Sequence, residues 1–247
     1  MFAVIAGVFA IWFVSTSLKW VDPKLVPAPL SVWKAFVDVM QNGYKNFTLL
    51  QHLSTSLERL LIAFFAAVII TVPLGLASGN SPKIRAALEP LIEFYRPLPP
   101  LAYYTLLVLW MGIGNESKIS LLFLACLAPI YIACASAVSK VREDYINSAL
   151  TVGATKWQIF VHVIFPACLP DIFTGIRTAL GVGYTTLVSA EMVAARSGVG
   201  WMVLDASRYM RSDIIFLGII LMGITGILLD RIILLIERKV VPWKGKD

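Results

Sequence analysis

The sequence is poor in charged residues and in the residue types that most often carry catalysis. Only 15% of its 247 residues are Asp, Glu, Lys or Arg, and it has 2 histidines and 3 cysteines. It contains no Gly-x4-Gly-Lys-Ser/Thr segment, which is the phosphate-binding loop of many ATPases. No Ser/His/Asp or Cys/His arrangement stands out either, with His52 and His162 far apart in the chain. We therefore expect no catalytic centre and no bound cofactor on this chain.

The few cysteines argue against a disulfide framework and against a metal site. Cys126, Cys134 and Cys168 lie in apolar stretches, with no CxxC pair and no histidine at ligand spacing. On one helix, Cys126 and Cys134 are separated by about 12 Å of rise, which is too far for a disulfide. We predict that all three are small packing residues and that the chain holds no metal.

Apolar residues are abundant, at 58% of the chain, and the mean hydropathy is +0.80. A soluble core of this size cannot hide so much apolar surface, whereas a membrane helix needs roughly 20 apolar residues. The opening run lacks a basic leader and a small-residue cleavage site, so we interpret it as a span and not as a signal peptide. We predict an all-α integral membrane protein with about six spans: 1–20, 57–77, 101–114, 119–138, 170–190 and 214–236.

The connection between the fourth and fifth predicted spans, residues 140–166, is long enough to have structure of its own. Residues 142–152 form a predicted helix, and Gly153 is placed to end it in a left-handed conformation. Thr155 and Gln158 have the spacing of a capping box that starts a second helix, and Pro166 is expected to close the element. That second helix has apolar residues at helical spacing: Trp157, Phe160, Val161 and Ile164. From the pattern alone, a solvated loop helix without a partner also fits.

The same segment resembles the coupling signature of ABC importer permeases, which docks in a groove of the ATPase subunit. In that family an acidic residue and two alanines precede a glycine, and Ile-x-Leu-Pro closes the motif. The spacing is intact, but Asn147 replaces the acidic residue, Ser148 replaces an alanine, and Phe165 replaces the leucine. Docking should therefore depend on shape and turn geometry more than on charge at position 147. The resemblance implies these coupling residues: Arg142, Asp144, Asn147, Ser148, Ala149, Gly153, Ala154, Thr155, Trp157 and Pro166.

The resemblance extends over nearly the whole chain. The segments 52–59, 89–100, 110–114 and 174–183 are similar to the nitrate/sulfonate/taurine permease group. Within that group, the segment 180–191 and the tail Pro-Trp-Lys-Gly at 242–245 are most similar to taurine permeases. The resemblance implies a type I ABC importer permease fold and transport of taurine or a related aliphatic sulfonate across the bacterial inner membrane. Nitrate or another small anion stays open as the substrate.

The family also implies partners. We expect a homodimer in the lipid bilayer, two cytoplasmic subunits that bind ATP and Mg²⁺ and hydrolyse the ATP, and a periplasmic substrate-binding protein. Basic residues are spread over the connections and the tail, which is usual for membrane proteins and gives no reason to expect nucleic acid. Two other classes compete: a channel or carrier that works without ATP, and a membrane enzyme, for which no catalytic constellation is found.

The predicted organisation is a single transmembrane domain, 1–247. Residues 21–56 form a periplasmic connection that contains an interfacial helix with Val32, Trp33, Phe36, Val37 and Met40 at helical spacing. The core spans lie within 57–236, with the coupling element 140–166 between them, and 237–247 is a tail. If the N-terminus is cytoplasmic, the basic connections at Lys83/Arg85 and Lys140/Arg142/Lys156 and the C-terminal tail are cytoplasmic too, and we expect this arrangement.

Ionisable residues within membrane spans are candidates for function. They are Glu93, Arg96, Arg177, Glu191 and Asp230. Arg177 either lines the path or extends to the cytoplasmic interface, and Glu191 either shapes the path or supports the turn before Gly198 and Gly200. Tyr184 and Thr185 offer polar atoms to a zwitterion or bond neighbouring helices. The candidates for the translocation path are Tyr104, Arg177, Tyr184, Thr185 and Glu191.

Overall fold

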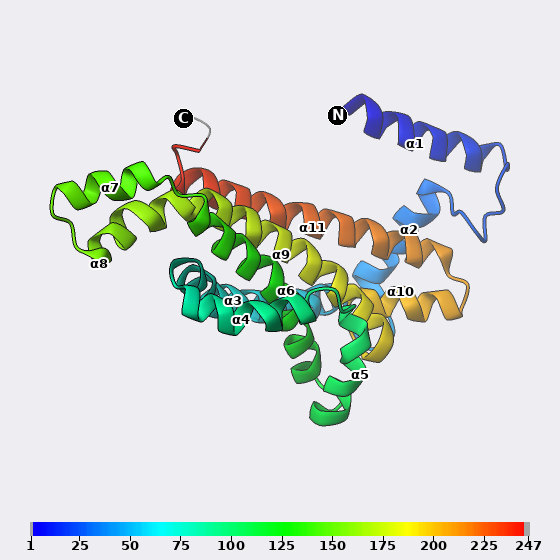
Figure 1. Ribbon diagram of the computed structural model, residues 1–247. Coiled ribbons are helices and arrows are strands. Elements are labelled where there is room, and N and C mark those ends of the chain that lie inside the picture. The colour runs from blue at the N-terminus through cyan, green and yellow to red at the C-terminus, as the bar shows by residue number, and fades with distance from the viewer. Residues whose placement is uncertain (1, 245–247) are drawn as a thin grey trace. The chain divides into compact units, whose positions relative to one another are not determined.

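The computed structural model describes residues 2–244, with side chains from Ala6 onward. Within that range every regular element is helical, and the β pairing is limited to one isolated bridge between Tyr44 and Phe47 (Figure 1). The elements are α1 (Phe2–Ser17), α2 (Pro29–Asn42), α3 (Leu49–Asn80), α4 (Pro82–Tyr95), α5 (Pro100–Met111), α6 (Asn115–Ser139), α7 (Glu143–Thr151), α8 (Lys156–Ile159), the π-helix η1 (Phe160–Ile164), α9 (Phe165–Ala194), α10 (Val199–Arg208) and α11 (Ser212–Val240).

Proline and glycine set many of these boundaries. Pro29, Pro82 and Pro100 stand in the first turns of α2, α4 and α5, where the missing N–H costs no helical hydrogen bond. Gly43 and Gly112 follow α2 and α5 with φ of 76° and 82°, a backbone conformation that glycine adopts most cheaply. The break between α3 and α4 falls at the second of these prolines, with α3 ending at Asn80 and α4 beginning at Pro82.

Four described helices are long and apolar enough to cross a membrane, and they contain the predicted second, fourth, fifth and sixth spans: Leu49–Asn80, Asn115–Ser139, Lys156–Ala194 and Ser212–Val240. The predicted first and third spans correspond to the shorter apolar helices Ala6–Ser17 and Pro100–Met111. The all-α membrane class is confirmed, and α5 begins close to the predicted residue Leu101. The second predicted span, 57–77, is shorter than α3, which begins at Leu49. The first turns of α3 are polar, so the hydrophobic pattern did not include them.

The chain packs as two compact units: unit 1 (Met1–Glu58 and Leu187–Gly226) and unit 2 (Arg59–Thr186 and Ile227–Asp247). The core of unit 1 joins α2 to α10 and to the start of α11, and Val39, Met202 and Ile214 are almost fully buried there. The Tyr44 hydroxyl donates a hydrogen bond to Asp205 Oδ2 at 2.8 Å. Burial, reinforced by this bond, raises the pKa of Tyr44 above its ordinary value.

The predicted interfacial helix forms as α2, and one of its faces packs on the protein. Val32, Ala35 and Val39 face the core of unit 1, while Trp33 and Met40 stay 62% and 59% exposed. The core of unit 1 thus takes small and β-branched residues of α2, and larger apolar side chains remain on its exposed side.

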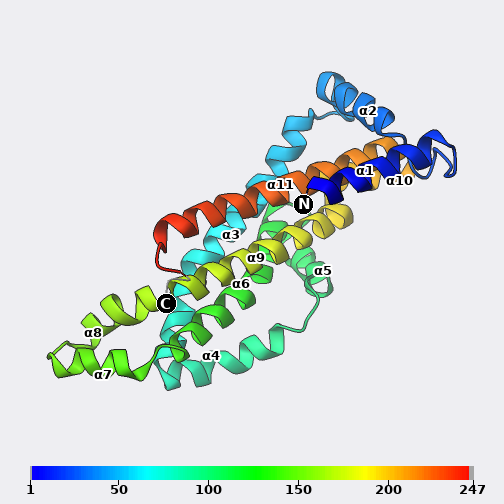
Figure 2. The ribbon, with the colours of Figure 1, turned by 90° about the horizontal axis from the view of Figure 1, so that it is seen from above.

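Unit 2 is built on small residues between its long helices. A Cβ atom on Gly75 or Gly79 of α3 would lie 2.6 Å from the Cβ of Cys134 or Val138 on α6. A Cβ on Gly175 of α9 would lie 2.3 Å from that of Ala133. Small residues let membrane helices approach this closely. In unit 2, helices α6 and α9 consequently run side by side in opposite directions (Figure 2).

Candidate functional site

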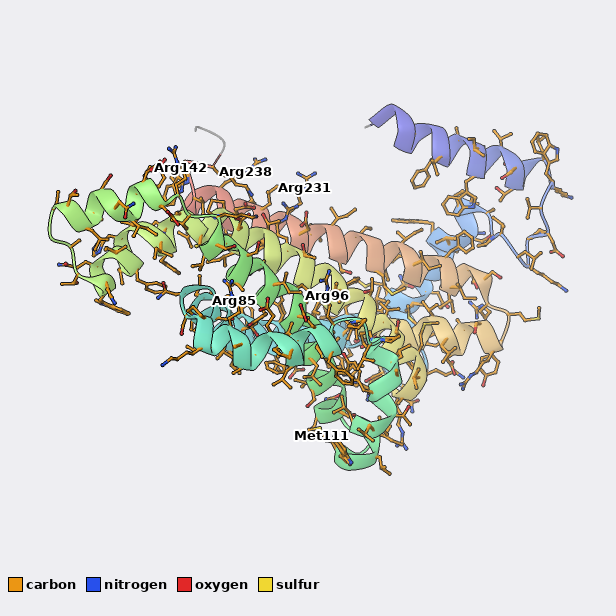
Figure 3. All side chains as sticks on the ribbon, in the orientation of Figure 1. Arg85, Arg96, Met111, Arg142, Arg231 and Arg238 are labelled. Carbon is orange, nitrogen blue, oxygen red and sulfur yellow. The ribbon has the colours of Figure 1, made fainter. Side chains whose placement is uncertain are left out.

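The predicted coupling element forms a helical hairpin in unit 2, made of α7, a tight turn and α8 (Figure 1). Arg142 stands at the N-terminal boundary of α7, where Figure 3 labels it, and its Nη2 donates to Asp144 Oδ2 at 2.8 Å. The guanidinium also lies over the Tyr145 ring, 5.3 Å from its centroid. The hydrogen bond to Asp144 raises the pKa of Arg142 further, so Arg142 stays charged at all physiological pH values.

The glycine turn is confirmed in detail. Gly153 has a φ of 82°, and its N–H donates to Leu150 O at 3.0 Å. The next N–H, of Ala154, reaches back to Ala149 O at 3.1 Å. These two bonds form the Schellman motif, which satisfies carbonyls at the helix end and requires a residue in the left-handed region. Gly153 thus ends α7 as predicted.

The predicted capping box is also present. The Thr155 hydroxyl accepts a bond from Gln158 N at 3.3 Å, and Thr155 N donates to Gln158 Oε1 at 2.8 Å. The two side chains therefore satisfy backbone donors at the start of α8 reciprocally. The chain reverses direction between α7 and α8 in only a few residues, and both sides of that reversal are held by local hydrogen bonds.

The prediction that Pro166 closes the element is wrong. Helical structure continues from Lys156 to Ala194, and Pro166 lies in the first turn of α9. A proline inside a helix normally clashes with the carbonyl four residues earlier and removes one hydrogen bond. Here the preceding residues 160–164 form a π-helix, and Phe165 N donates to Phe160 O at its end. The wider turn accommodates the proline without ending the helix.

The hairpin leaves much of its apolar surface uncovered by its own chain. No residue of α7 is buried, and Val152 and Trp157 are 83% and 73% exposed. Of the second helix, Ile159 and Ile164 are buried, whereas the exposed Trp157 stacks on Phe160 with ring centroids 6.0 Å apart. Among the coupling candidates, Asn147, Ser148, Gly153 and Thr155 are exposed, whereas Ala149 and Ala154 are half-buried.

A groove of about 680 Å³ opens in unit 2 beside this hairpin. Trp157, Phe160 and Phe165 form one side of the groove, and the C-terminal half of α3 forms the other. Its lining is mainly apolar, and Lys156 is its one charged residue. The hairpin therefore offers a partner both a projecting turn and an adjacent depression.

Two of the path candidates, Arg177 and Glu191, form hydrogen bonds or ion pairs with other residues of the chain. In unit 2, Arg177 forms a two-point ion pair with Asp230 of α11, at 2.9 and 3.1 Å. Glu237 lies 4.0 Å from the same guanidinium and also contacts Lys244. Arg177 and Asp230 were separate functional candidates in the sequence. In the structure their charges balance each other.

The other of these two candidates is Glu191 of unit 1, which is only 1% exposed. Its carboxylate accepts hydrogen bonds from Gly200 N at 2.9 Å and from the Ser56 hydroxyl at 2.8 and 3.0 Å. Ser56 accepts from Val199 N, and His52 Nδ1 accepts from Gly198 N at 3.1 Å. Of the two interpretations of Glu191, support of the turn is the one with observed contacts.

The remaining path candidates lie in unit 2. Tyr104 is 1% exposed in α5, and Tyr184 is half-buried in α9. Thr185 is exposed, and its hydroxyl contacts the carbonyls of Gly181 and Val182 within its own helix.

A cavity of about 500 Å³ in unit 2 was not predicted. It lies between the α4–α5 junction, α6 and α9, and none of the five path candidates lines it. Its polar lining comprises Tyr95, Arg96, Tyr103, Ser136, Lys140, Asp171, Thr174 and Thr178. Two sequence features could have pointed to this cavity. Arg96 stands in a proline-rich break of an apolar stretch, and Thr174 and Thr178 are four residues apart, which puts both on one face of a helix.

Comparison with known proteins agrees with the architecture. The sequence profile of the family described as binding-protein-dependent transport system inner membrane component matches residues 47–242. The taurine transport system permease protein TauC of Escherichia coli (strain K12) is 40% identical over 243 residues, which are 98% of this chain and 88% of that protein. A putative aliphatic sulfonates transport permease protein, SsuC, of the same organism is 34% identical over 96% of this chain and 89% of its own length. The nitrate import permease protein NrtB of Synechocystis is 31% identical over 90% of this chain and 82% of its own length.

A solved inward-facing structure of the MetNI methionine ABC transporter shares the fold. Its TM-score is 0.59, and the match covers 75% of this chain and 95% of that chain at 18% identity. The predicted type I importer permease fold is therefore confirmed. The chain belongs to the family of inner-membrane permease components of binding-protein-dependent ABC transporters, within its nitrate, sulfonate and taurine group.

Proposed function

We propose that this chain is the permease of an ATP-driven importer that moves taurine or a related aliphatic sulfonate across the bacterial inner membrane. The observation that carries the proposal is the hairpin at α7 and α8. Its turn is held by a Schellman glycine and a capping box, yet its large apolar side chains remain exposed. A stiff projection with uncovered apolar surface is suited to bind a partner and to transmit force to the helix that follows it.

The occupant of this surface is an ATPase subunit, which binds ATP and Mg²⁺ and supplies the hydrolysis that the permease lacks. Asn147, Ser148 and Ala149 present small side chains beside the turn, so that a partner surface approaches the backbone closely. Trp157 then contacts the rim of the partner groove. Because α8, η1 and α9 form one helical run, movement of the hairpin is passed directly into a membrane-spanning helix.

Two copies of the permease, two ATPase subunits and one periplasmic binding protein make up the working transporter. Both termini of the chain lie in the cytoplasm, on the side of the hairpin. ATP binding brings the two ATPase subunits together, and the permease halves rotate so that their shared path faces outward. This is alternating access by rigid-body motion. Among the path candidates, Tyr184 and Thr185 of α9 line the translocation path, while the buried Tyr104, together with Arg177 and Glu191, keeps its helix in place.

The substrate is assigned on family grounds. The named relative at 40% identity is a taurine permease, and relatives at 34% and 31% are named for aliphatic sulfonates and nitrate. An aliphatic sulfonate without an amine, or nitrate, is therefore the second candidate substrate.

Uptake into vesicles tests both parts of the proposal. The permease is reconstituted with its ATPase and binding protein, and uptake of labelled taurine, ethanesulfonate and nitrate is followed with and without ATP. We expect ATP-dependent accumulation of taurine above the outside concentration. Transport by the permease alone, without ATP, would contradict the ATP-driven importer and favour a channel or carrier. ATP-driven uptake of nitrate but not taurine would overturn the substrate only.

A further inference from the structure

The cavity in unit 2 has a chemical asymmetry that the family assignment does not explain. Helices α6 and α9 form two of its walls, and their close approach at Ala133 and Gly175 leaves small side chains along them. The third wall is the junction between α4 and α5, where Figure 3 labels Arg96. The volume of about 500 Å³ is within the range of small-molecule sites.

Arg96 is the unbalanced cation of this cavity. Among residues 2–244, no hydrogen bond or ion pair engages its guanidinium, whereas Lys140, the other cation, contacts Asp171 at 3.3 Å. The lining therefore carries a net positive charge. A guanidinium offers five N–H donors in a planar fork, a geometry that suits the oxygens of a carboxylate, phosphate or sulfonate.

Two tyrosines beside Arg96 add a further donor. The hydroxyls of Tyr95 and Tyr103 lie 2.8 Å apart, and either one donates to the other. One of the two hydroxyl hydrogens is used in this bond, so the second is available to a ligand. The α4–α5 wall thus presents mainly hydrogen-bond donors, which favour an anionic group.

The α9 wall has the opposite character. The Thr174 hydroxyl donates to Pro170 O and the Thr178 hydroxyl donates to Thr174 O, both at 2.9 Å. Because these hydrogens are committed to the helix backbone, the two oxygens face the cavity as acceptors only. Asp171, one residue beyond Pro170, adds a carboxylate that Lys140 already contacts at 3.3 Å, so an ammonium would share it with Lys140. An ammonium group, which only donates, matches this wall.

We propose that this cavity binds a small zwitterion, with its sulfonate or carboxylate at Arg96 and its ammonium at Thr174, Thr178 and Asp171. The permease then adds its own selection for the amine to that of the binding protein. This inference rests on the proposed import of taurine, because taurine joins a sulfonate and an ammonium through two carbons. Ethanesulfonate has the same anionic group without the amine, so it fills only one of the two subsites.

Direct binding to the permease–ATPase complex, without the binding protein, tests the inference separately from transport. Labelled taurine is titrated into the complex in lipid nanodiscs, and ethanesulfonate and ethylamine compete. We expect saturable taurine binding, with both competitors at least tenfold weaker, which is the loss expected for one hydrogen bond to a charged group. No saturable taurine binding by a complex that still imports taurine would overturn the cavity assignment. Failure of import by the wild type would instead count against the proposed function.

Variants then separate the two subsites. Thr178→Val keeps the side-chain shape and removes the acceptor, so we expect about tenfold weaker taurine binding and unchanged ethanesulfonate binding. Arg96→Gln should weaken both ligands, with partial recovery in Arg96→Lys. Thr225→Val and Arg231→Gln, which do not line the cavity, are matched controls. The two-subsite arrangement would be refuted if Thr178→Val weakened both ligands equally, or if Arg96→Gln had no effect on binding. The amount of folded complex is measured for every variant.

Discussion

The guanidinium of Arg177 meets the carboxylate of Asp230 through two hydrogen bonds, although 53 residues separate them in the chain. The pair joins α9 to α11 within unit 2, and Glu237 extends it toward Lys244 near the C-terminal tail. Two charges that looked like separate candidates for function are therefore one structural connection. Their proximity makes the energetic role of each dependent on the other.

Removing one partner of this pair should destabilise the protein. Asp230→Asn leaves the Arg177 charge poorly compensated, which costs about 2.5 to 3.5 kcal/mol at the centre of a bilayer but about 1 kcal/mol or less where water reaches the pair. We expect a loss of about 1 to 3 kcal/mol, measured as a lower melting temperature in detergent. The exchanged variant, with Arg177→Asp and Asp230→Arg together, should recover most of it. No recovery by the exchange would show that the ion pair is not the source of the effect.

Glu191 should be more important for stability than for substrate affinity. Glu191→Leu leaves Gly200 N and the Ser56 hydroxyl without their acceptor, and each unsatisfied buried group costs about 1 to 3 kcal/mol. Glu191→Gln keeps one acceptor oxygen and should lose less. Thermal unfolding measures both variants, with the exposed Glu93→Leu as the control. Normal melting combined with a raised KM for uptake would instead place Glu191 in the path.

Local features of the hairpin were predictable from sequence because their hydrogen bonds join residues close in the chain. The bonds of the capping box link residues three apart, and those of the Schellman turn link residues three and five apart. The prediction for Pro166 was wrong because it, too, used only a local rule. The usual effect of proline is to end a helix, but here a π-helix precedes it and the helical run continues from Lys156 to Ala194.

The unpredicted features are those that bring distant segments together. The cavity combines Arg96, Lys140 and Thr178 from three parts of the chain, and no spacing rule relates them. The orientation of α2 likewise depended on a core supplied by α10 and α11, more than 150 residues later in the sequence. Hydrophobic pattern located the membrane helices well because length and composition alone determine whether a segment can cross a bilayer.

Close packing of α3 against α6 should make Gly75 intolerant of even one methyl group. In Gly75→Ala, the new Cβ meets Cys134 Cβ at 2.6 Å, so we expect a loss of about 1 to 3 kcal/mol from overpacking. Gly181→Ala on α9 is the control, since its Cβ has no neighbour within 4 Å and alanine favours the helix. Melting temperatures of the purified variants provide the measurement.

A second change should test whether that contact is the cause. Cys134→Gly removes the Cβ atom that Gly75→Ala would strike, so the double variant should lose less stability than the two single losses together. Additive losses would show that Gly75 matters for another reason, such as the backbone geometry around Pro73 in the same helix.

Gly153 should be required for coupling but not for membrane folding. Its φ of 82° strains a β-branched residue by about 1 to 3 kcal/mol, while open space around its Cβ position excludes a clash with the rest of the chain. Gly153→Val should therefore insert and melt normally in its membrane helices but lose most ATP-driven uptake, because the turn between α7 and α8 is distorted. Gly153→Asn, which tolerates the left-handed conformation better, should retain more uptake than valine. Copurification with the ATPase subunit shows whether the loss occurs at docking, and normal uptake in Gly153→Val would remove the hairpin from the coupling role.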